Sequence, residues 1–244
     1  MNFEAYVHQF QTLYLDARGQ KPETLEPLAR HLGTVPKRIV IVAPHPDDEC
    51  LMAGIALRAK LEHGAEVAVL PFTYGSMVNR QRDRKTELDH ALQILHFTKL
   101  DPRGSGEDEL DFDQVKLALL EFCPDAVILP HPRDGHSTHI RCSEIAIRAT
   151  LEIAQEEKRR IQVFQSEFWQ SLESPNLLLP LSEEVVTRMG KALLCHVGEI
   201  ERNPYHLTLP AWLMDQVRRG SEIHKGGAKG NTVFGQLYRF DEIG

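Results

Sequence analysis

Residues 38–49 read Arg-Ile-Val-Ile-Val-Ala-Pro-His-Pro-Asp-Asp-Glu, and this stretch indicates the fold class. The apolar run at 39–43 is typical of a buried strand and is far shorter than the ~18 residues that a membrane helix needs. The polar residues that follow predict a helix over 48–63, with Gly64 at its C-terminal cap. A buried strand that leads directly into a helix favours an α/β protein.

The same alternation of strands and helices continues along the chain. Further strands are predicted at 66–72, 126–129, 161–169 and 232–240, and further helices at 80–97, 113–122, 140–156, 183–195 and 211–224. Strands that are joined through helices require crossover connections. The sequence therefore predicts a Rossmann-like three-layer α/β/α sandwich with a mostly parallel sheet.

The N-terminal segment has a different pattern. Apolar residues three and four positions apart over 3–15 predict an amphipathic helix, and a second, short helix is predicted over 23–32. We therefore divide the chain into an N-terminal helical extension of residues 1–37, packed on the domain, and a single domain of residues 38–244.

Composition excludes several classes of protein. With 42% hydrophobic and 26% charged residues among 244, the chain can bury a core and is not disordered. Its net charge of −7 argues against a general nucleic-acid binder. The four cysteines form no Cys-x-x-Cys pair, which argues against a cysteine zinc site and a disulfide framework. Because neither a signal-peptide pattern nor a long apolar run is found, we expect a cytoplasmic protein without membrane insertion.

The loop after the strand at 39–43 is acidic. In open α/β sheets, ligands bind beyond the carboxyl ends of the strands. Asp47, Asp48 and Glu49 stand where a nucleotide-binding fold has glycines, and their charges repel a pyrophosphate but suit a cation. Taken singly, His45 is also compatible with a capping or hydrogen-bonded histidine, and the two aspartates with acids in a first helical turn.

The loop after the strand at 126–129 is rich in histidine. It contains His131, His136 and His139, and it faces the acidic loop if the two strands are near neighbours. Two histidines and one carboxylate, with a position left for water, are the ligand set of a catalytic zinc. The two loops together therefore favour a metal site over unrelated structural roles.

The motif His45-Pro46-Asp47-Asp48-Glu49, followed downstream by His136-x-x-His139, resembles the PIG-L/LmbE-like superfamily of zinc-dependent N-acetylglucosaminyl deacetylases. Three further segments resemble this family more weakly: Arg84-x-x-Glu87-x-x-x-Ala91, Pro124-Asp125-Ala-Val-Ile and Lys191-Ala-Leu-Leu-Cys-His196. The resemblance covers residues 38–225.

The resemblance implies a hydrolase that removes the N-acetyl group from a 2-acetamido sugar, as a small molecule or a conjugate, and releases acetate and a free amine. It implies one Zn²⁺ per chain, bound by His45, Asp48 and His139. Asp47 is then the general base, and His136 polarises the carbonyl and stabilises the oxyanion. The family commonly has an Asp at the position of Thr138.

Other residues of the loops keep several roles open. His131 is an alternative metal ligand, and Asp134 is a candidate to replace the missing Asp. Arg84, Asp134 and Glu167 are candidate substrate-binding residues, and loop 73–80 is a candidate wall of the site. For Arg84, an ion pair with Glu87 three residues later on the helix is the alternative explanation.

Three alternative functions are compatible with the same metal motifs. They are an amidase of the same family that acts on a glucosamine conjugate, an unrelated metal hydrolase such as a phosphoesterase, and a sugar-binding member with weakened or lost turnover. The absence of an apolar anchor in the sequence favours a soluble small-molecule substrate over a lipid. The sequence leaves open whether copies of the chain form a homo-oligomer.

Overall fold

The computed structural model describes residues 2–21, 24–103, 109–202, 208–223 and 233–244. Its strands form one sheet in the order β3-β2-β1-β4-β5-β7-β6. The strand bounds are β1 Arg38–Ala43, β2 Glu66–Pro71, β3 Thr98–Lys99, β4 Ala126–Pro130, β5 Ile161–Ser166, β6 Leu177–Leu181 and β7 Phe234–Ile243. Strands β1 to β5 are parallel, whereas β7 is antiparallel to both β5 and β6. The predicted mostly parallel sheet is confirmed.

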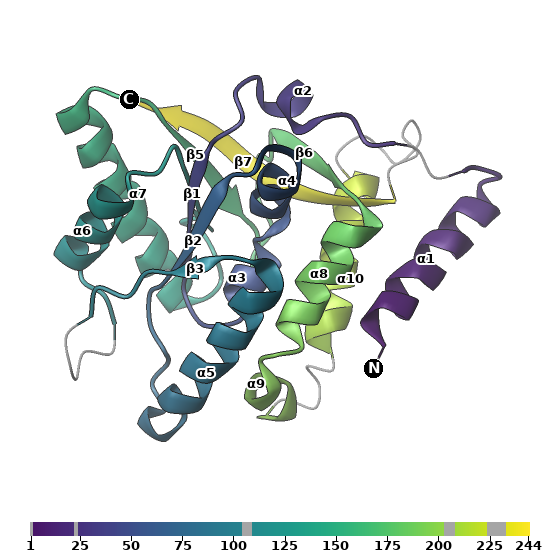
Figure 1. The fold of residues 1–244 in the computed structure, drawn as a ribbon, viewed down its shortest axis with the longest axis horizontal. Helices are drawn as coiled ribbons and strands as arrows, with labels where there is room; N and C mark the ends of the chain where they lie inside the picture. Colours follow the sequence, from purple (N-terminus) through teal and green to yellow (C-terminus); the bar gives the residue numbers. More distant parts are fainter. Residues whose placement is uncertain (1, 22–23, 104–108, 203–207, 224–232) are drawn as a thin grey trace.

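Helices cover both faces of this sheet (Figure 1). Their bounds are α1 Phe3–Ala17, α2 Leu28–Leu32, α3 Asp48–Leu51, α4 Gly54–His63, α5 Val78–Leu95, α6 Phe112–Phe122, α7 Ser137–Glu157, α8 Glu183–Leu193, α9 Val197–Arg202 and α10 Thr208–Ile223. Helices α6 and α7 lie on one face, and α3, α4, α5, α8 and α10 lie on the other. The predicted three-layer sandwich is confirmed.

Strand β1 shows how the sequence produces the two faces. Successive side chains of a strand point to opposite sides. Ile39 and Ile41 join the core beneath α4, α5 and α8, whereas Val40 and Val42 join the core beneath α6 and α7. Because both faces are buried, the strand is a continuous apolar run without polar alternation.

Helix α1 packs against α8, on the outside of the α8 layer (Figure 1). Phe3 and Val7 are buried in the larger core, and the Phe3 ring fills the space that a side chain at residue 190 would need. Gly190 therefore allows the close approach of the two helices. Within the described residues, no helix is long and apolar enough to cross a membrane.

The single helix predicted at 48–63 is wrong, because the chain forms α3 and α4 with a break at residues 52 and 53. Two side chains of β7 reach into this break. Gln236 bonds to the Leu51 carbonyl and the Gly54 amide, and the Tyr238 hydroxyl bonds to the Met52 carbonyl and the Ile55 amide. Backbone groups that a continuous helix would pair internally are thus satisfied from the sheet.

Other predicted bounds also differ. The helix predicted at 23–32 begins only at Leu28, because Pro27 is its N-cap with an extended ψ of 144° and disfavours helix for the residue before it. Strand β6 was not predicted, since it contains Pro180 and lacks regular alternation; it pairs at the edge of the sheet, where proline is tolerated. The strand predicted at 161–169 ends at Ser166, which leaves 167–169 as a loop.

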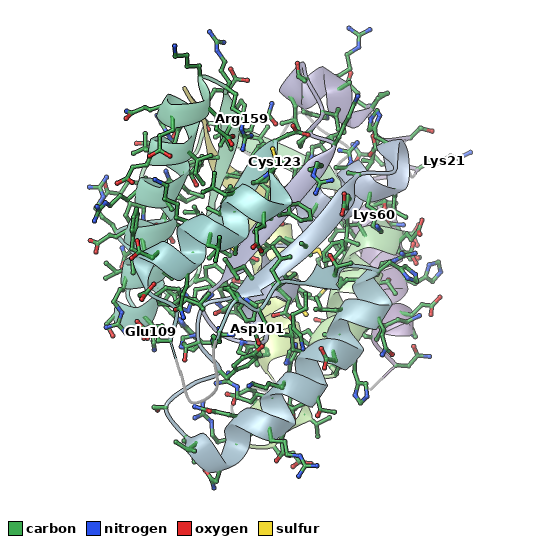
Figure 2. The ribbon with its side chains drawn as sticks, turned by 60° about the vertical axis from the view of Figure 1, so that its left-hand side comes forward. Lys21, Lys60, Asp101, Glu109, Cys123 and Arg159 are labelled. Atoms are coloured by element: carbon green, nitrogen blue, oxygen red, sulfur yellow. The ribbon has the colours of Figure 1, made fainter. Side chains whose placement is uncertain are left out.

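The carboxyl ends of the parallel strands meet at one edge of the molecule. Strands β1 and β4 are direct neighbours, so the loops that follow them lie side by side. Figure 2 shows this polarity, with Asp101 and Glu109 at the lower end and Cys123 and Arg159 at the opposite end. Residues that carry the candidate chemistry are therefore expected together near Asp101 and Glu109.

Candidate metal and active site

Three residues from the two loops converge on one point. The Asp48 carboxylate oxygen Oδ2 lies 3.2 Å from Nδ1 of His45 and 3.3 Å from Nε2 of His139. Asp48 and His139 are 5% and 1% exposed. Ligand atoms that surround a tetrahedral zinc at 2.0–2.1 Å stand about 3.3 Å apart, so the donor types and their spacing fit zinc. The three predicted ligands are thus brought together.

The charges of these groups support one another. Burial alone raises the pKa of Asp48, but the neighbouring His139 and His45 outweigh it and hold that pKa well below its usual range. Burial lowers the pKa of His139, and the Asp48 charge outweighs this and raises it. A divalent cation requires an ionised carboxylate and neutral imidazoles, so the lowered pKa of Asp48 favours metal binding, whereas the raised pKa of His139 means that binding displaces a proton.

Asp134 supports this group from behind. Its Oδ1 lies 3.5 Å from Nδ1 of His139 and accepts a hydrogen bond from the His136 amide at 2.9 Å. Its Oδ2 accepts one from the Trp169 amide at 3.1 Å. A carboxylate on the far nitrogen of a ligating histidine fixes which nitrogen faces the metal. Asp134 is 4% exposed and is not among the residues that line the cavity described below.

His136 is the N-cap of α7 and lines the cavity. The centroid of its ring lies 5.1 Å from those of both His45 and His139. Burial and these two histidines lower the pKa of His136, which favours the neutral ring. Its Nδ1 accepts a hydrogen bond from the Thr138 amide, so the proton of the neutral ring lies on Nε2. The ring therefore offers one N–H donor.

Asp47 has an unusual backbone between β1 and α3. Its φ of 117° lies in the left-handed region that non-glycine residues rarely adopt, at a cost of about 1–3 kcal/mol. Its amide donates to Oε2 of Glu49 at 2.8 Å. Burial and then the Asp48 charge raise the pKa of Asp47 well above its usual range. Asp47 and Asp48 are thus adjacent in sequence, but their pKa values are shifted in opposite directions.

A cavity of about 410 Å³ is lined by His45, Asp47, Asp48, His136 and His139. Residues 73–77 line one side of it, as predicted for loop 73–80. The remaining side chains that line it are Leu51, Arg80, Arg84, Glu109, Thr138, Arg141, Phe168, Trp169, Glu199, Arg202, Leu209 and Trp212.

An arginine wall, formed by Arg80, Arg84 and Arg202 around Glu199, makes one side of the cavity positive. The carboxylate of Glu199 lies 3.7 Å, 3.5 Å and 2.8 Å from these three guanidinium groups in that order. One carboxylate cannot neutralise three cations. The alternative ion pair of Arg84 with Glu87 is not formed. Arg84 pairs with Glu199, and Glu87 accepts a hydrogen bond from the Gly198 amide at 2.7 Å.

Aromatic rings form another part of the cavity lining. Trp169 is 54% exposed, and its ring centroid lies 6.2 Å from that of Trp212. Phe168 contacts the His139 ring edge-on, with centroids 4.9 Å apart. Flat apolar surfaces of this kind suit the faces of a ring-shaped ligand.

Two other predicted residues lie elsewhere. Glu167 is 4% exposed, and its Oε2 accepts a hydrogen bond from the Leu172 amide at 3.1 Å. His131 is 5% exposed, and its Nε2 lies 2.7 Å from the Gln170 carbonyl oxygen. Neither is among the residues that line the cavity. Both hold the loop that positions Trp169.

Several cavity residues were not predicted. Glu199, Arg202 and Trp212 come from α9 and α10, and Glu109 and Arg141 lie outside the two motif loops. In the sequence none of them has a distinctive spacing or neighbour. The packing of α9 and α10 beside the carboxyl ends of the strands brings Glu199, Arg202 and Trp212 to the site.

Comparison with known proteins decides the family of the motif-bearing part. The model of the GlcNAc-PI de-N-acetylase family, PIG-L, matches residues 40–150. Residues 40–150 are a PIG-L domain. This PIG-L domain contains the complete group of His45, Asp48 and His139, together with Asp47 and His136. The predicted resemblance is confirmed.

A curated relative supports the PIG-L assignment. It is the "Probable N-acetyl-alpha-D-glucosaminyl L-malate deacetylase 2" of Bacillus cereus, 27% identical over 142 residues, which are 50% of this chain and 64% of the relative. The match thus spans less than two thirds of the relative's length.

Solved structures share the fold of the PIG-L domain and its surroundings. A conserved protein from Thermus thermophilus matches with a TM-score of 0.63 at 20% identity, over 83% of this chain and 93% of that one. The N,N'-diacetylchitobiose deacetylase from Pyrococcus horikoshii matches with a TM-score of 0.62 at 15% identity, over 89% and 87%. The 4-carboxy-2-hydroxymuconate hydratase from Pseudomonas putida matches with a TM-score of 0.61 at 18% identity, over 84% and 95%. Since the fold occurs in a hydratase as well as a deacetylase, the fold alone does not give the reaction.

Proposed function

We propose that the protein is a zinc-dependent N-deacetylase that hydrolyses the acetamido group of a sugar-type molecule or conjugate and releases acetate and a free amine. The observation that carries this proposal is the convergence of His45, Asp48 and His139 with Asp47 and His136 at one end of a single cavity. Similarity to the Bacillus cereus relative and to the Pyrococcus horikoshii enzyme, both of which are described as deacetylases, supports the proposal.

The residues divide the reaction between them. Zinc bound by His45, Asp48 and His139 supplies Lewis-acid activation of water and of the amide carbonyl. Asp47 accepts a proton from the attacking water, and its raised pKa brings its basicity closer to neutral pH. A carbon–oxygen bond first forms at the carbonyl and gives a tetrahedral oxyanion. The carbon–nitrogen bond then breaks as the carbonyl forms again, and the proton held by Asp47 passes to the departing nitrogen.

His136 acts on the charge that develops at the carbonyl. Its neutral ring carries its proton on Nε2, so this N–H can donate a hydrogen bond to the developing oxyanion. Donors that are oriented before the reaction stabilise an oxyanion strongly, and the loss of one typically costs about 10²–10³ in rate. Thr138, in place of the acid common in the family, contacts His136 through its backbone amide, and so leaves this donor intact.

The walls of the cavity favour a particular kind of acetamido sugar. The arginine wall attracts an anionic group, and the Trp169 and Trp212 rings suit the face of a sugar. A glucosamine joined to an organic acid has both features, as in the name of the Bacillus cereus relative. We therefore place an acid-bearing conjugate ahead of a neutral oligosaccharide as the substrate. A cytoplasmic location and assembly into a homo-oligomer stay predictions.

The test is a direct assay of both products. The purified protein is stripped with a chelator, reloaded with zinc, and incubated with N-acetylglucosamine, N-acetylglucosaminyl malate and N,N'-diacetylchitobiose, and acetate and primary amine are measured. We expect equal amounts of the two products, most rapidly from the malate conjugate, and none from the stripped protein. Zinc-dependent binding of these sugars without product would instead support a sugar-binding protein.

A further inference from the structure

A second group of titratable side chains lies directly behind Asp47. Glu49, Cys50 and His196 are all 0% exposed. Oε1 of Glu49 lies 2.8 Å from Nε2 of His196 and accepts from the Cys50 thiol at 3.1 Å. We call these three residues the buried triad. None of its members is among the residues that line the cavity, so no role in contacting substrate explains them.

The second carboxylate oxygen of Glu49 connects the buried triad to Asp47. Oε2 accepts a hydrogen bond from the amide of Asp47 at 2.8 Å. This contact spans only two residues and requires the Asp47 amide to point inward, toward Glu49. The φ of 117° at Asp47 is the backbone conformation in which this contact is made. A strained conformation persists only where surrounding contacts determine it, and Glu49 supplies one.

His196 determines where the Glu49 carboxylate points. Its backbone lies between α8 and α9, with its amide bonded to the Leu193 carbonyl and its own carbonyl accepting from the Glu199 amide. The ring therefore has a fixed origin, independent of the loop that carries Asp47. The Glu49 charge raises the pKa of His196 against the effect of burial, which is consistent with a held ion pair.

We propose that Glu49, oriented by His196, is a positioning residue that holds Asp47 in its left-handed conformation and so directs its carboxylate into the cavity. This inference rests on the proposed function, because it assumes that Asp47 is the base. The residue types of the triad also suit a metal, but Oε1 of Glu49 already receives two donors, and we expect one zinc per chain.

The first pair of variants separates the hydrogen bond from the side-chain volume. Glu49→Leu removes both acceptors, and we expect kcat to fall by about 10²-fold with KM and zinc content unchanged, since misplacement of a reacting group by about 1 Å costs this much. Glu49→Gln keeps an oxygen for the Asp47 amide, and its NH₂ can donate to His196, whose Nδ1 has no partner among the described contacts and can take the proton. We expect Glu49→Gln to recover about 10-fold of the loss.

A second pair of variants changes His196, the residue that orients Glu49. His196→Leu leaves the Glu49 carboxylate without its orienting donor, whereas His196→Gln keeps one. We expect kcat to fall in His196→Leu and to be largely kept in His196→Gln, again with unchanged zinc content. If Glu49→Leu does not fold, this pair carries the same comparison. Crystal structures give a readout independent of activity, and in both Leu variants φ at Asp47 is expected to leave the left-handed region.

The matched control is an ion pair with one buried partner, and neither of its residues lines the cavity. Arg58 is 2% exposed and pairs with Glu62 at 2.6 Å. Arg58→Met should lower Tm while kcat stays unchanged, which shows that lost stability alone does not lower turnover. A zinc-loaded Glu49→Leu enzyme with wild-type kcat, or with φ at Asp47 unchanged, would overturn the inference. An inactive wild-type protein would instead contradict the proposed function, and the crystallographic φ would still test the positioning.

Discussion

At the scale of single residues, two neighbouring aspartates receive opposite environments. Asp48 faces two imidazoles, which lower its pKa, whereas burial and Asp48 itself raise the pKa of Asp47. Both residues line the cavity, and the φ of 117° at Asp47 differs from the helical backbone that begins at Asp48. Adjacent carboxylates can therefore act as a metal ligand and as a base within one turn of chain.

This division predicts different results for two matched substitutions. Asp47→Asn should keep zinc and lose about 10²–10⁴ in kcat, because the amide cannot accept the proton from water. Asp48→Asn should lose zinc, because it removes the only charged ligand. Metal analysis beside acetate release checks both. A fully active Asp47→Asn enzyme would remove the assignment of Asp47 as the base.

A third residue-scale prediction concerns Asp134. It touches the His139 ring and the amides of His136 and Trp169, but it does not line the cavity. Asp134→Asn should weaken zinc binding by about 10–100-fold, as for other carboxylates behind a ligating histidine. Titration of the stripped protein with zinc against a competing chelator measures this. Wild-type zinc affinity in the variant would mean that Asp134 only holds the loop.

At the scale of elements, α3 and α4 are two helices because β7 supplies partners for the backbone between them. Tyr238 is fully buried, and its hydroxyl bonds to the Met52 carbonyl and the Ile55 amide. The break shortens α3 to one turn, so its first residue, Asp48, stays at the carboxyl edge beside β4.

Tyr238→Phe should therefore lower the free energy of unfolding by about 1–3 kcal/mol, because the two backbone groups lose their partner. Tyr6→Phe is the matched control, since Tyr6 is 38% exposed and a surface change of this kind stays within about 0.5 kcal/mol. Denaturant unfolding measures both variants. An equal, small effect in the two variants would mean that water replaces the hydroxyl.

Local sequence patterns predict much of this structure, but features that depend on contacts between distant residues could not be predicted. The apolar run before His45 predicts β1, and the order of strand and loop predicts that His136 and His139 follow β4, although α7 begins at Ser137 and not at the predicted residue 140. In contrast, the α3–α4 break depends on Gln236 and Tyr238, which lie far along the chain. The helix propensity of residues 48–63 therefore does not predict the break. In the arginine wall, the sequence predicts Arg84 and, through loop 73–80, Arg80. It does not predict Glu199 and Arg202, which reach the site only through tertiary packing.

At the scale of the whole molecule, the metal site joins two separate parts of the chain. His45 and Asp48 follow β1, and His139 lies in α7, so a bound ion links segments that only the folded state brings together. A ligand that binds only the folded state stabilises it by mass action.

Removal of zinc should therefore lower Tm. At a free zinc concentration of about 100 times the dissociation constant, the stabilisation is about 2.7 kcal/mol. For a chain of this size that corresponds to roughly 5–10 °C in Tm. Thermal unfolding with zinc and with a chelator measures the shift, and Asp48→Asn serves as the control that should show none. A shift that persists in Asp48→Asn would point to zinc bound elsewhere.

The position of β7 has a consequence for how the protein is made. Strand β7 lies between β5 and β6 and pairs with both, although it is the last strand in the chain. On the ribosome, the motif loops and five parallel strands emerge well before it, and until it arrives β5 presents an unpaired edge, which invites association between nascent chains. Insertion of the final strand then closes this edge and delivers Gln236 and Tyr238 to the α3–α4 break. Among the described strands β7 is thus synthesised last, and the α3–α4 break that it completes can form only after the motif loops have been made.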